Sequence, residues 1–316
     1  MVVLPPKTAL SKQTKRFWRR VDGVILLDKP RGITSNAALQ IVRRLFSAAK
    51  AGHTGTLDPL ATGLLPLCLG EATKFSTDLL DADKTYEADL FFGIVTDTGD
   101  ADGNVIRRYE PGFSQQDLEA ALQRFKGEIR QVPPMYSALK KDGRPLYQLA
   151  RQGVEVEREA RTVTIHELAL LESTVRTCRI RVSCSKGTYV RTLAEDIGEA
   201  LGCGAHLIAL RRTRVGDLSI AQAVSLDFLE TCSEAQRSEC LLSSDTLLQS
   251  LSAIILQEQE AKRFSHGNPV SSTAGTMTKC RVYFGEQLLG LGEVDVTGRL
   301  CPRRLVASDT VEGRSR

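Results

Sequence analysis

The 316-residue sequence lacks several features that would mark a specialised class of protein. It has no apolar run long enough to cross a bilayer, and no apolar segment follows its basic N-terminus as in a secretory signal. Its eight cysteines are scattered without a C-x-x-C pair, which favours a cytoplasmic protein with reduced thiols. Cys203 and His206 have a spacing that two metal ligands could share, but no second pair supports them. A buried thiol and a structural histidine are the better interpretation.

The sequence also lacks a strong overall charge, because its formal net charge is only +4. The distribution of charge is more informative than the sum. Three basic clusters, each of which taken singly fits a solvated surface, lie over residues 7–20, 140–144 and 211–214. Together they make a polyanion a reasonable partner, since each phosphate contact releases condensed counterions.

Length and composition predict one large domain or two unequal ones around an ordinary core, with 42% hydrophobic and 25% charged residues. We expect a basic N-terminal arm over 1–20, a large domain over 21–249 and a small, mostly β module over 250–316. Within the large domain, an excursion over about 133–161 opens with two prolines and contains a basic turn. The polar loop 96–103 resembles a cation loop but lacks the EF-hand spacing and its terminal glutamate.

Apolar periodicity and turn residues place the main elements. Strands are predicted over 23–28, 84–92, 162–171, 178–183, 205–210, 279–284, 288–296 and 300–306. Helices are predicted over 35–46, 76–80, 114–125, 189–201 and 257–264, with shorter helical segments over 225–250. Gly127 is expected to end the helix over 114–125.

Asp58 is the single acid in the glycine-rich stretch that precedes residue 71. Pro59 pushes it out of the helical region, and nearby glycines allow backbone angles that a side chain disfavours. Those glycines are Gly52, Gly55 and Gly63. Residues 64–69 are too apolar for a surface loop, so we expect this turn to be anchored to the core. A carboxylate held in this way is either turn-forming or reactive, and from Asp58 alone the turn-forming role is the better interpretation.

Several stretches match one known family in the same order. The segment GHTGTLDPLATG around Asp58 resembles the catalytic motif of the TruB-type tRNA pseudouridine synthases, the tRNA pseudouridine-55 synthase family. GVILLDKPRG, over 23–32, resembles their first motif, and Tyr86 falls where they carry an active-site tyrosine. Residues 184–198 and 204–212 resemble two more motifs. The similarity covers about 22–215 and, more loosely, the C-terminal module, which resembles a PUA-like RNA-binding domain.

The resemblance implies an α+β fold with a mixed, mainly antiparallel sheet flanked by helices and a small β-rich PUA-like domain. It implies an enzyme that isomerises the uridine at position 55 in the TΨC loop of tRNA to pseudouridine. The base would be flipped out, and the glycosidic bond would break and re-form with the help of an aspartate. No metal or organic cofactor would be used. The partner would be the T-arm stem-loop of tRNA, with no membrane and no obligatory protein partner, and the chain would act as a monomer.

The resemblance also implies three catalytic residues. Asp58 would be the nucleophile, Arg191 its cationic partner, and Tyr86 the residue that stacks on the uracil and assists proton transfer at C5. Cleavage of a ribose–base bond builds positive charge at C1′, which a positioned carboxylate can stabilise or attack. On spacing alone, Arg191 fits a surface helix charge, and Tyr86 fits ordinary strand packing with its hydroxyl at the surface.

Four further matched residues would bind the substrate. Tyr189 and Leu210 would line the base pocket, and His53 would contact the RNA near the extruded base. Lys29 would support the active site or a phosphate. Without the family, Leu210 fits the core and His53 fits a turn. The excursion over 133–161 falls where the family inserts a segment that grips RNA, and its basic residues suit backbone contacts.

Two other functions stay open at this stage. The chain could be a tRNA-binding chaperone that helps tRNA fold, or a catalytic subunit guided by a small RNA, a class that relies on protein partners. Whether Asp58 attacks C1′, attacks the base or deprotonates C2′ is also left open by the sequence.

Overall fold

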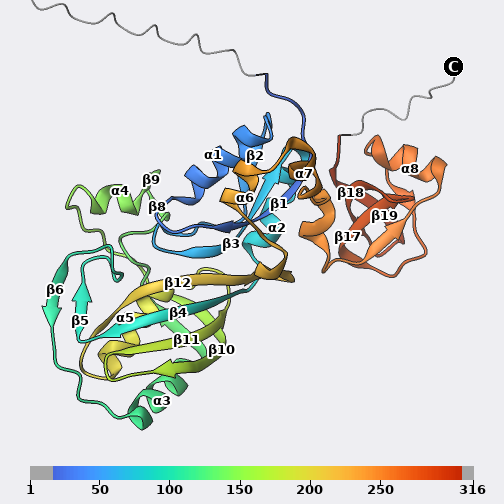
Figure 1. Cartoon of the computed structure of the whole chain (residues 1–316). Coiled ribbons are helices and arrows are strands. Elements are labelled where there is room, and N and C mark those ends of the chain that lie inside the picture. Colours follow the sequence, from blue (N-terminus) through green and yellow to red (C-terminus); the bar gives the residue numbers. More distant parts are fainter. Residues whose placement is uncertain (1–16, 308–316) are drawn as a thin grey trace, which may run out of the picture.

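The computed structural model describes residues 17–307, so most of the predicted basic arm, residues 1–16, lies outside the described residues, as do residues 308–316. The large body is built on a ten-stranded sheet, and a separate five-stranded sheet follows toward the C-terminus (Figure 1). The path through the large sheet is β14-β1-β3-β12-β4-β11-β10-β7, with β2 beside β3 and β13 beside β12. Its strands are β1 (Gly23–Lys29), β2 (Ala51–His53), β3 (Thr62–Leu69), β4 (Lys84–Phe92), β7 (Gly127–Gln131), β10 (Arg161–Ser173), β11 (Thr177–Cys184), β12 (Ala205–Val215), β13 (Leu218–Ser219) and β14 (Val224–Ser225).

Most neighbours in this sheet run antiparallel, while β1 with β14 and β3 with β12 run parallel. The remaining elements of the large body are α1 (Ser35–Leu45), η1 (Gly70–Lys74), α2 (Ser76–Leu80), the β5–β6 hairpin (Ile94–Thr96 and Val105–Arg108), α3 (Gln115–Arg124), β8 (Lys140–Lys141), β9 (Arg144–Pro145), α4 (Leu146–Ala150), α5 (Val190–Ala200), η2 (Ile220–Gln222), α6 (Leu226–Thr231), α7 (Glu234–Glu239) and η3 (Ser244–Leu248). The smaller sheet and its helix comprise β15 (Ala253–Ile255), α8 (Glu258–Ser265), β16 (Val270–Ser271), β17 (Met277–Phe284), β18 (Gln287–Val294) and β19 (Arg299–Leu305). The mixed, mainly antiparallel α+β fold with a β-rich C-terminal part is confirmed.

Local signals explain where the main helices begin and which faces they bury. Thr34 caps α1, its hydroxyl accepting a hydrogen bond from the Ala37 amide at 3.0 Å, and α1 packs on β1 and β3 in one core cluster. Helices α3 and α5 pack with β4, β10, β11 and β12 in a second cluster. Tyr86 and Leu210 pack against both clusters, so they mark the place where the two halves of the core meet.

Two expectations about the sheet are wrong. Gly127 does more than end α3, because it is the first residue of β7. The strand after residue 205 continues to Val215, so the third basic cluster lies within β12 instead of on a free surface. Arg212 is 1% exposed, and both terminal nitrogens of Arg211 bond the Asp28 carboxylate, at 2.7 and 3.1 Å. The interpretation of residues 211–214 as a solvated or phosphate-binding patch is therefore wrong for the buried Arg212, whereas Arg211 is partly exposed but paired and Arg214 is exposed.

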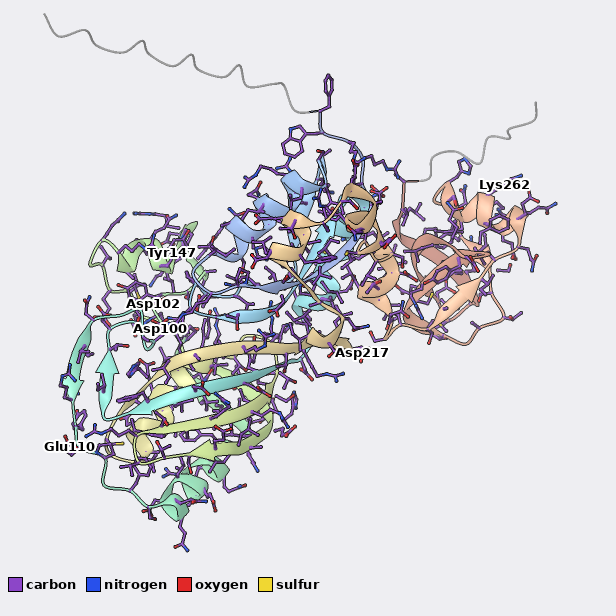
Figure 2. All side chains as sticks on the ribbon, in the orientation of Figure 1. Asp100, Asp102, Glu110, Tyr147, Asp217 and Lys262 are labelled. Atoms are coloured by element: carbon purple, nitrogen blue, oxygen red, sulfur yellow. The ribbon has the colours of Figure 1, made fainter. Side chains whose placement is uncertain are left out.

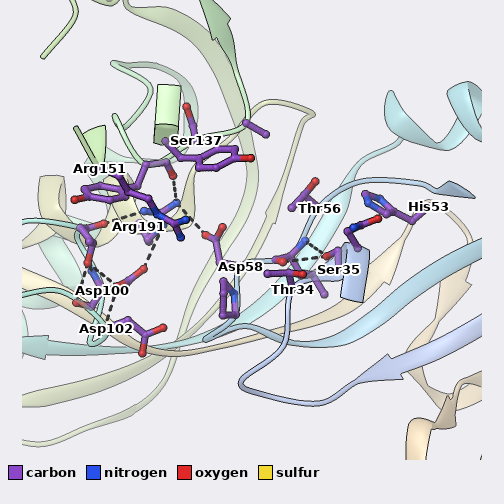
Figure 3. Close-up of a pocket in the computed structure, with 17 residues that line it drawn as sticks. Thr34, Ser35, His53, Thr56, Asp58, Asp100, Asp102, Ser137, Arg151 and Arg191 are labelled. Carbon is purple, nitrogen blue, oxygen red and sulfur yellow. Dashed lines mark hydrogen bonds and ion pairs between the residues drawn. The ribbon is translucent and has the colours of Figure 1, made fainter. Parts of the chain in front are cut away.

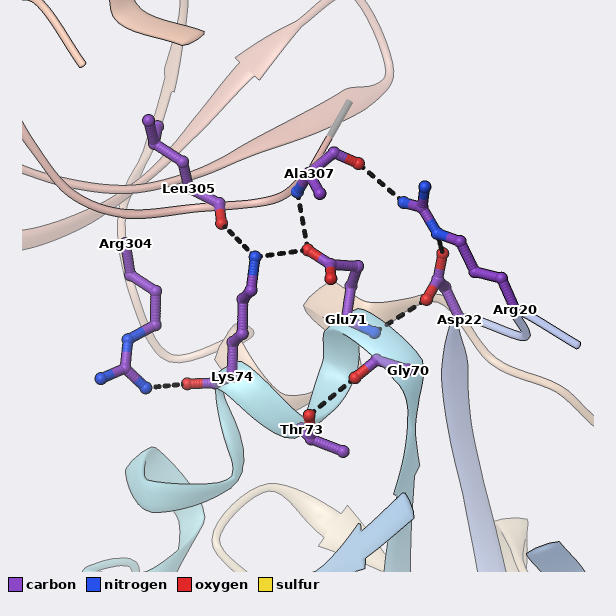
Figure 4. Close-up of polar contacts among 9 residues, drawn as sticks. All are labelled: Arg20, Asp22, Gly70, Glu71, Thr73, Lys74, Arg304, Leu305 and Ala307. Carbon is purple, nitrogen blue, oxygen red and sulfur yellow. Dashed lines mark hydrogen bonds and ion pairs between the residues drawn. The ribbon is translucent and has the colours of Figure 1, made fainter. Parts of the chain in front are cut away.

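The C-terminal sheet is joined to the large body by polar contacts around η1 (Figure 4). The Glu71 carboxylate accepts hydrogen bonds from the Lys74 ammonium at 2.7 Å and from the Ala307 amide at 2.6 Å. The Lys74 ammonium also donates to the Leu305 carbonyl at 2.9 Å. These contacts fix the end of β19 against the large body. The predicted domain boundaries at residues 20 and 249 stay predictions.

Over residues 17–307, no helix is both long and apolar enough to span a membrane.

Candidate active site

The turn that carries Asp58 is gripped by the start of α1. The Ser35 hydroxyl accepts a hydrogen bond from the Leu57 amide at 2.7 Å and donates one to the Leu57 carbonyl at 3.0 Å (Figure 3). The Gly32 amide donates to the Pro59 carbonyl at 2.8 Å. The backbone on both sides of Asp58 is therefore held, and the direction of its side chain is set before any substrate arrives.

Two of the three glycines near Asp58 adopt the expected positive φ. Gly55 has φ +102° and Gly63 has φ +100°, whereas Gly52 is an ordinary residue of β2. A Cβ at Gly63 would collide with the backbone oxygen of Arg212 on β12. Gly63 thus allows the close approach of β3 and β12 beneath the turn.

Arg191 lies against Asp58, as the resemblance implies. Its Nη2 is 2.9 Å from Asp58 Oδ2, and the arginine side chain is 6% exposed while that of Asp58 is 42% exposed (Figure 3). The guanidinium also donates to the Thr98 carbonyl at 2.9 Å and to the Tyr136 carbonyl at 2.6 Å. The alternative of a surface helix charge is wrong, because this residue is buried in the first turn of α5.

A second carboxylate, that of Asp100, lies on the other side of Arg191. Asp100 Oδ2 is 3.7 Å from the arginine Nε, and its Oδ1 accepts hydrogen bonds from the Thr98 hydroxyl at 2.6 Å and the Asp102 amide at 3.1 Å. The loop over 96–103 that the sequence left without a function therefore supports Arg191. This role could not be predicted, since no local pattern links residues 100 and 191. Among the described residues, no group of three or more His, Cys, Asp or Glu is placed to hold a metal ion.

Tyr86 and Leu210 lie on the neighbouring central strands β4 and β12. Tyr86 pairs across the strands with Arg212, and Leu210 with Ala88. Burial raises the pKa of the Tyr86 phenol, and the charge of Arg212 opposes that shift. Tyr86 is partly buried between the two core clusters, so its hydroxyl is not at an open surface.

Lys29 is completely buried at the end of β1. Its ammonium donates to the carbonyls of Pro30, at 2.9 Å, and Ile33, at 2.8 Å. Burial lowers the pKa of Lys29 to about 8, although the nearby Asp58 carboxylate favours the charged form. A phosphate would meet no exposed surface of this side chain, so of its two predicted roles we retain support of the site.

Tyr189 and His53 approach Asp58 from different elements. Tyr189 precedes α5, its amide donating to the Gln131 side chain at 3.0 Å, and burial raises the pKa of its phenol. His53 ends β2, and burial together with the charge of Arg212 lowers its pKa, which favours a neutral ring. Its buried Nδ1 has no hydrogen-bond partner in the protein.

A cavity of about 650 Å³ opens beside Asp58, within the size range of small-molecule sites. It brings Asp58, Arg191 and His53 together with residues from the excursion, and its lining residues are Thr34, Ser35, Asn36, His53, Thr56, Leu57, Asp58, Pro59, Thr98, Asp100, Asp102, Tyr136, Ser137, Ala138, Tyr147, Arg151 and Arg191. Lys29, Tyr86, Tyr189 and Leu210 do not line it. Asp58 nevertheless influences the pKa of the first three of these residues, so they lie near its carboxylate.

Sequence reasoning missed Tyr147 and Arg151, which line the cavity from α4. Their guanidinium-to-ring distance is 5.6 Å, and Tyr147 lies near Asp100 and Asp102 (Figure 2). Their spacing of four residues was a usable signal, because on a helix it places both side chains on one face.

Three family models match consecutive parts of the chain. Residues 43–190 match the N-terminal domain of the TruB family pseudouridylate synthases. Residues 191–255 match the tRNA pseudouridylate synthase B C-terminal domain, and residues 252–306 match the C-terminal part of pseudouridine synthase II TruB.

Known proteins agree with these models. The chain is 60% identical to tRNA pseudouridine synthase B of Dechloromonas aromatica, over 93% of this chain and 98% of that protein. It is 55% identical to the protein of the same name from Azoarcus sp., over 92% and 97% of the two chains. Among solved structures, a chain of a Cbf5-Nop10-Gar1 complex has a TM-score of 0.66 and 26% identity, covering 90% of this chain and 80% of that one. A chain of an H/ACA RNP bound to a substrate RNA containing 2′-deoxyuridine shares the fold, with a TM-score of 0.69, 23% identity and coverage of 90% and 85%. The chain belongs to the TruB family of tRNA pseudouridylate synthases and is a pseudouridine synthase.

Proposed function

We propose that this enzyme converts the uridine at position 55, in the TΨC loop of tRNA, to pseudouridine. The observation that carries the proposal is the ion pair of Asp58 with the buried Arg191 at the edge of a cavity of nucleotide size. The names of the relatives at 55–60% identity support tRNA as the substrate. The position in the loop rests on the resemblance of the motif around Asp58.

The charges of Asp58 and Arg191 suit the isomerisation of uridine to pseudouridine. The bond from C1′ to N1 breaks, a bond from C1′ to C5 forms, C5 loses a proton and N1 gains one. Positive charge develops at C1′ if the bond breaks as in glycoside hydrolysis, and a preorganised carboxylate stabilises or attacks that carbon. Arg191 pairs with the Asp58 carboxylate and balances its charge in a site from which the substrate excludes water. Tyr86 stacks on the uracil and assists proton transfer at C5.

Asp100 acts as a positioning residue for Arg191. If Asp58 forms a bond to the sugar or the base, its negative charge is lost, and the buried guanidinium would lose its partner. An unpaired buried charge costs several kcal/mol. Because Asp100 lies 3.7 Å from the arginine Nε, a carboxylate stays beside Arg191 throughout the reaction.

The target base must leave its loop to reach Asp58, which costs about a few kcal/mol of lost stacking. Tyr86, Tyr189 and Leu210, none of which lines the cavity, receive the flipped base, and His53, which does line it, contacts the RNA beside the base. The excursion over 133–161 holds the RNA backbone, with Tyr147 and Arg151 at the cavity. A monomer that works in the cytoplasm without a protein partner stays our prediction.

The test is Asp58→Asn, which keeps the shape of the side chain and removes its charge. We expect tRNA binding within about threefold of the parent and a loss of pseudouridine formation of at least about 1,000-fold. Product is measured by mapping pseudouridine at each uridine of the tRNA. Asp217→Asn, at an exposed turn after β12, is the matched control and keeps full activity. Normal pseudouridine formation by Asp58→Asn would refute the assignment of Asp58 as the nucleophile.

The same assay separates the alternatives. We expect the purified chain alone to modify a bare T-arm hairpin. A requirement for a guide RNA or a second protein would instead indicate an RNA-guided subunit. Rescue of tRNA folding by Asp58→Asn would indicate a chaperone function beside catalysis.

A further inference from the structure

Arg212 is the largest side chain that the fold buries completely, with 1% of its surface exposed. Its neighbour Arg211 pairs with Asp28, but among the described residues no carboxylate forms an ion pair with Arg212. A buried charge without a counterion is costly unless its hydrogen bonds are satisfied and it serves a purpose. The groups that this guanidinium touches therefore indicate why it is there.

The guanidinium ties the two ends of the Asp58 turn together. Its Nε donates to the Leu64 carbonyl at 2.8 Å, and its Nη2 donates to the Gly55 carbonyl at 3.3 Å. Gly55 precedes Asp58, and Leu64 follows it on β3. The guanidinium packs against this backbone, since even a Cβ at Gly55 would stand in ordinary contact with Nη1, at 3.7 Å. The backbone of the turn is thus held by hydrogen bonds from Arg212 on β12 as well as by those with Ser35 on α1.

The same guanidinium reaches Tyr86. Arg212 and Tyr86 are direct partners across β12 and β4. Both the charge of Arg212 and a side-chain hydrogen bond to the phenol act against the effect of burial on the pKa of Tyr86. One group on the central strand therefore hydrogen-bonds both ends of the Asp58 turn and lies opposite the tyrosine, where its charge acts on the phenol.

We propose that Arg212 is a positioning residue for the reaction, which fixes the Asp58 turn and the Tyr86 phenol relative to each other beneath the flipped base. The inference rests on the proposed function. Arginine suits this role because its planar group donates in several fixed directions at once. Lysine keeps the charge but offers one flexible nitrogen, so it cannot bind both carbonyls and the phenol in the same geometry.

The experiment is a double-mutant cycle with Arg212→Lys and Tyr86→Phe, followed by single-turnover kinetics on tRNA. We expect Arg212→Lys alone to lower the rate about 10- to 100-fold, with tRNA binding within about threefold of the parent. In the Tyr86→Phe background the same change costs at least about threefold less, since part of its effect acts through the phenol. Effects that multiply independently would overturn the proposal. Arg179→Lys, on the exposed surface of β11, is the control and keeps full activity.

A second measurement decides the question if Arg212→Lys does not fold. In a structure of Asp58→Asn bound to a T-arm RNA, we expect the Arg212 guanidinium within about 3.2 Å of the Tyr86 oxygen and of the carbonyls of Gly55 and Leu64. A guanidinium turned away from the phenol contradicts the proposal. A parent enzyme that forms no pseudouridine refutes the proposed function instead, whereas an active parent with a fully active Arg212→Lys refutes the present inference alone.

Discussion

Arg191 is surrounded by acids that belong to different segments of the chain. Asp58 and Asp100 contact its guanidinium directly. Glu195 lies one helical turn further along α5, where burial raises its pKa to about 7, although the charge of Arg191 opposes the shift. This partly buried acid has no part in the proposed reaction, so its titration can be removed without touching the reacting groups.

Glu195→Gln should make the protein more stable above pH 7. The folded-state pKa of about 7 is higher than the ordinary glutamate value of 4.5, so the folded state holds a proton that the unfolded state releases between these values. Stability therefore falls as pH rises from 4.5 to 7, and above pH 7 the parent carries a penalty of about 1–3 kcal/mol that the variant lacks. The measurement is urea unfolding at a series of pH values.

The two proteins should differ little below about pH 3.5, where Glu195 is protonated in both states of the parent. In the variant, the free energy of unfolding still falls between pH 4 and 6, because burial also raises the pKa of Asp196 to about 6. Equal unfolding free energies of parent and variant at pH 8 would contradict the raised pKa of Glu195 in the folded protein.

Some contacts of the site could be predicted from the sequence and others could not. The contact of Arg191 with Asp58 came from the family resemblance, because on spacing alone the arginine fitted an exposed helix face. Arg212 was missed, since a run of arginines is typical of a surface and only the pairing of β12 with β3 and β4 buries this one. Contacts between distant segments depend on tertiary packing, which local patterns do not encode.

Among the elements, those with strong local signals were predicted well. Thr34 caps α1, and Ser114 forms a capping box with Asp117 at the start of α3, so both helices begin within a residue of the predicted place. Strand β7 was missed because it is short, largely exposed and defined by its pairing with β10. Strand β12 was predicted too short, because its second half is rich in arginine.

Gly63→Ala should weaken the contact between β3 and β12. The residue has φ +100°, and the added Cβ would collide with the backbone of Arg212, which cannot move without breaking the strand pairing. We expect a loss of about 2–4 kcal/mol in the free energy of unfolding, measured in urea.

Gly112→Ala is the matched control for this change. A Cβ at Gly112 meets nothing within 4 Å, and its φ lies outside the positive range. We expect this substitution to change stability by about 0.5 kcal/mol or less. A Gly63→Ala protein as stable as Gly112→Ala would mean that the two strands can separate at no cost.

At the scale of the whole molecule, the sequence predicted a large body followed by a small β-rich part, and the two separate sheets agree with it. The order of strands in the large sheet was not predictable. It places β1 beside β14 and β3 beside β12, pairs of segments far apart in the chain. The polar contacts between η1 and the end of β19 were hidden for the same reason, because Glu71 and Ala307 meet only in the folded protein.

The contacts of Glu71 and Lys74 with the end of β19 should affect the binding of long RNA substrates and not of short ones. Burial alone would raise the pKa of Glu71, but hydrogen bonds from Lys74 and from the Ala307 amide, with the charge of Lys74, lower it. The acid is therefore ionised at neutral pH, and its contact is weakened only as pH falls through that lowered pKa. The pair thus holds the C-terminal sheet in one orientation under working conditions (Figure 4).

We expect Glu71→Gln combined with Lys74→Met to raise KM for full-length tRNA about three- to tenfold and to leave kcat unchanged. The C-terminal sheet then keeps only its other contacts with the large body, such as the packing of Leu291 and the Lys279–Asp78 ion pair, and is held less firmly toward the rest of the RNA. KM for an isolated T-arm hairpin, which is too short to reach that sheet, should stay the same. Glu110→Gln with Arg176→Met removes another exposed ion pair of the large body, at 2.6 Å, and serves as the control. The two substrates differ only in the RNA beyond the T-arm. Equal increases of KM on both would therefore mean that Glu71 and Lys74 act on the catalytic site, which would contradict the prediction.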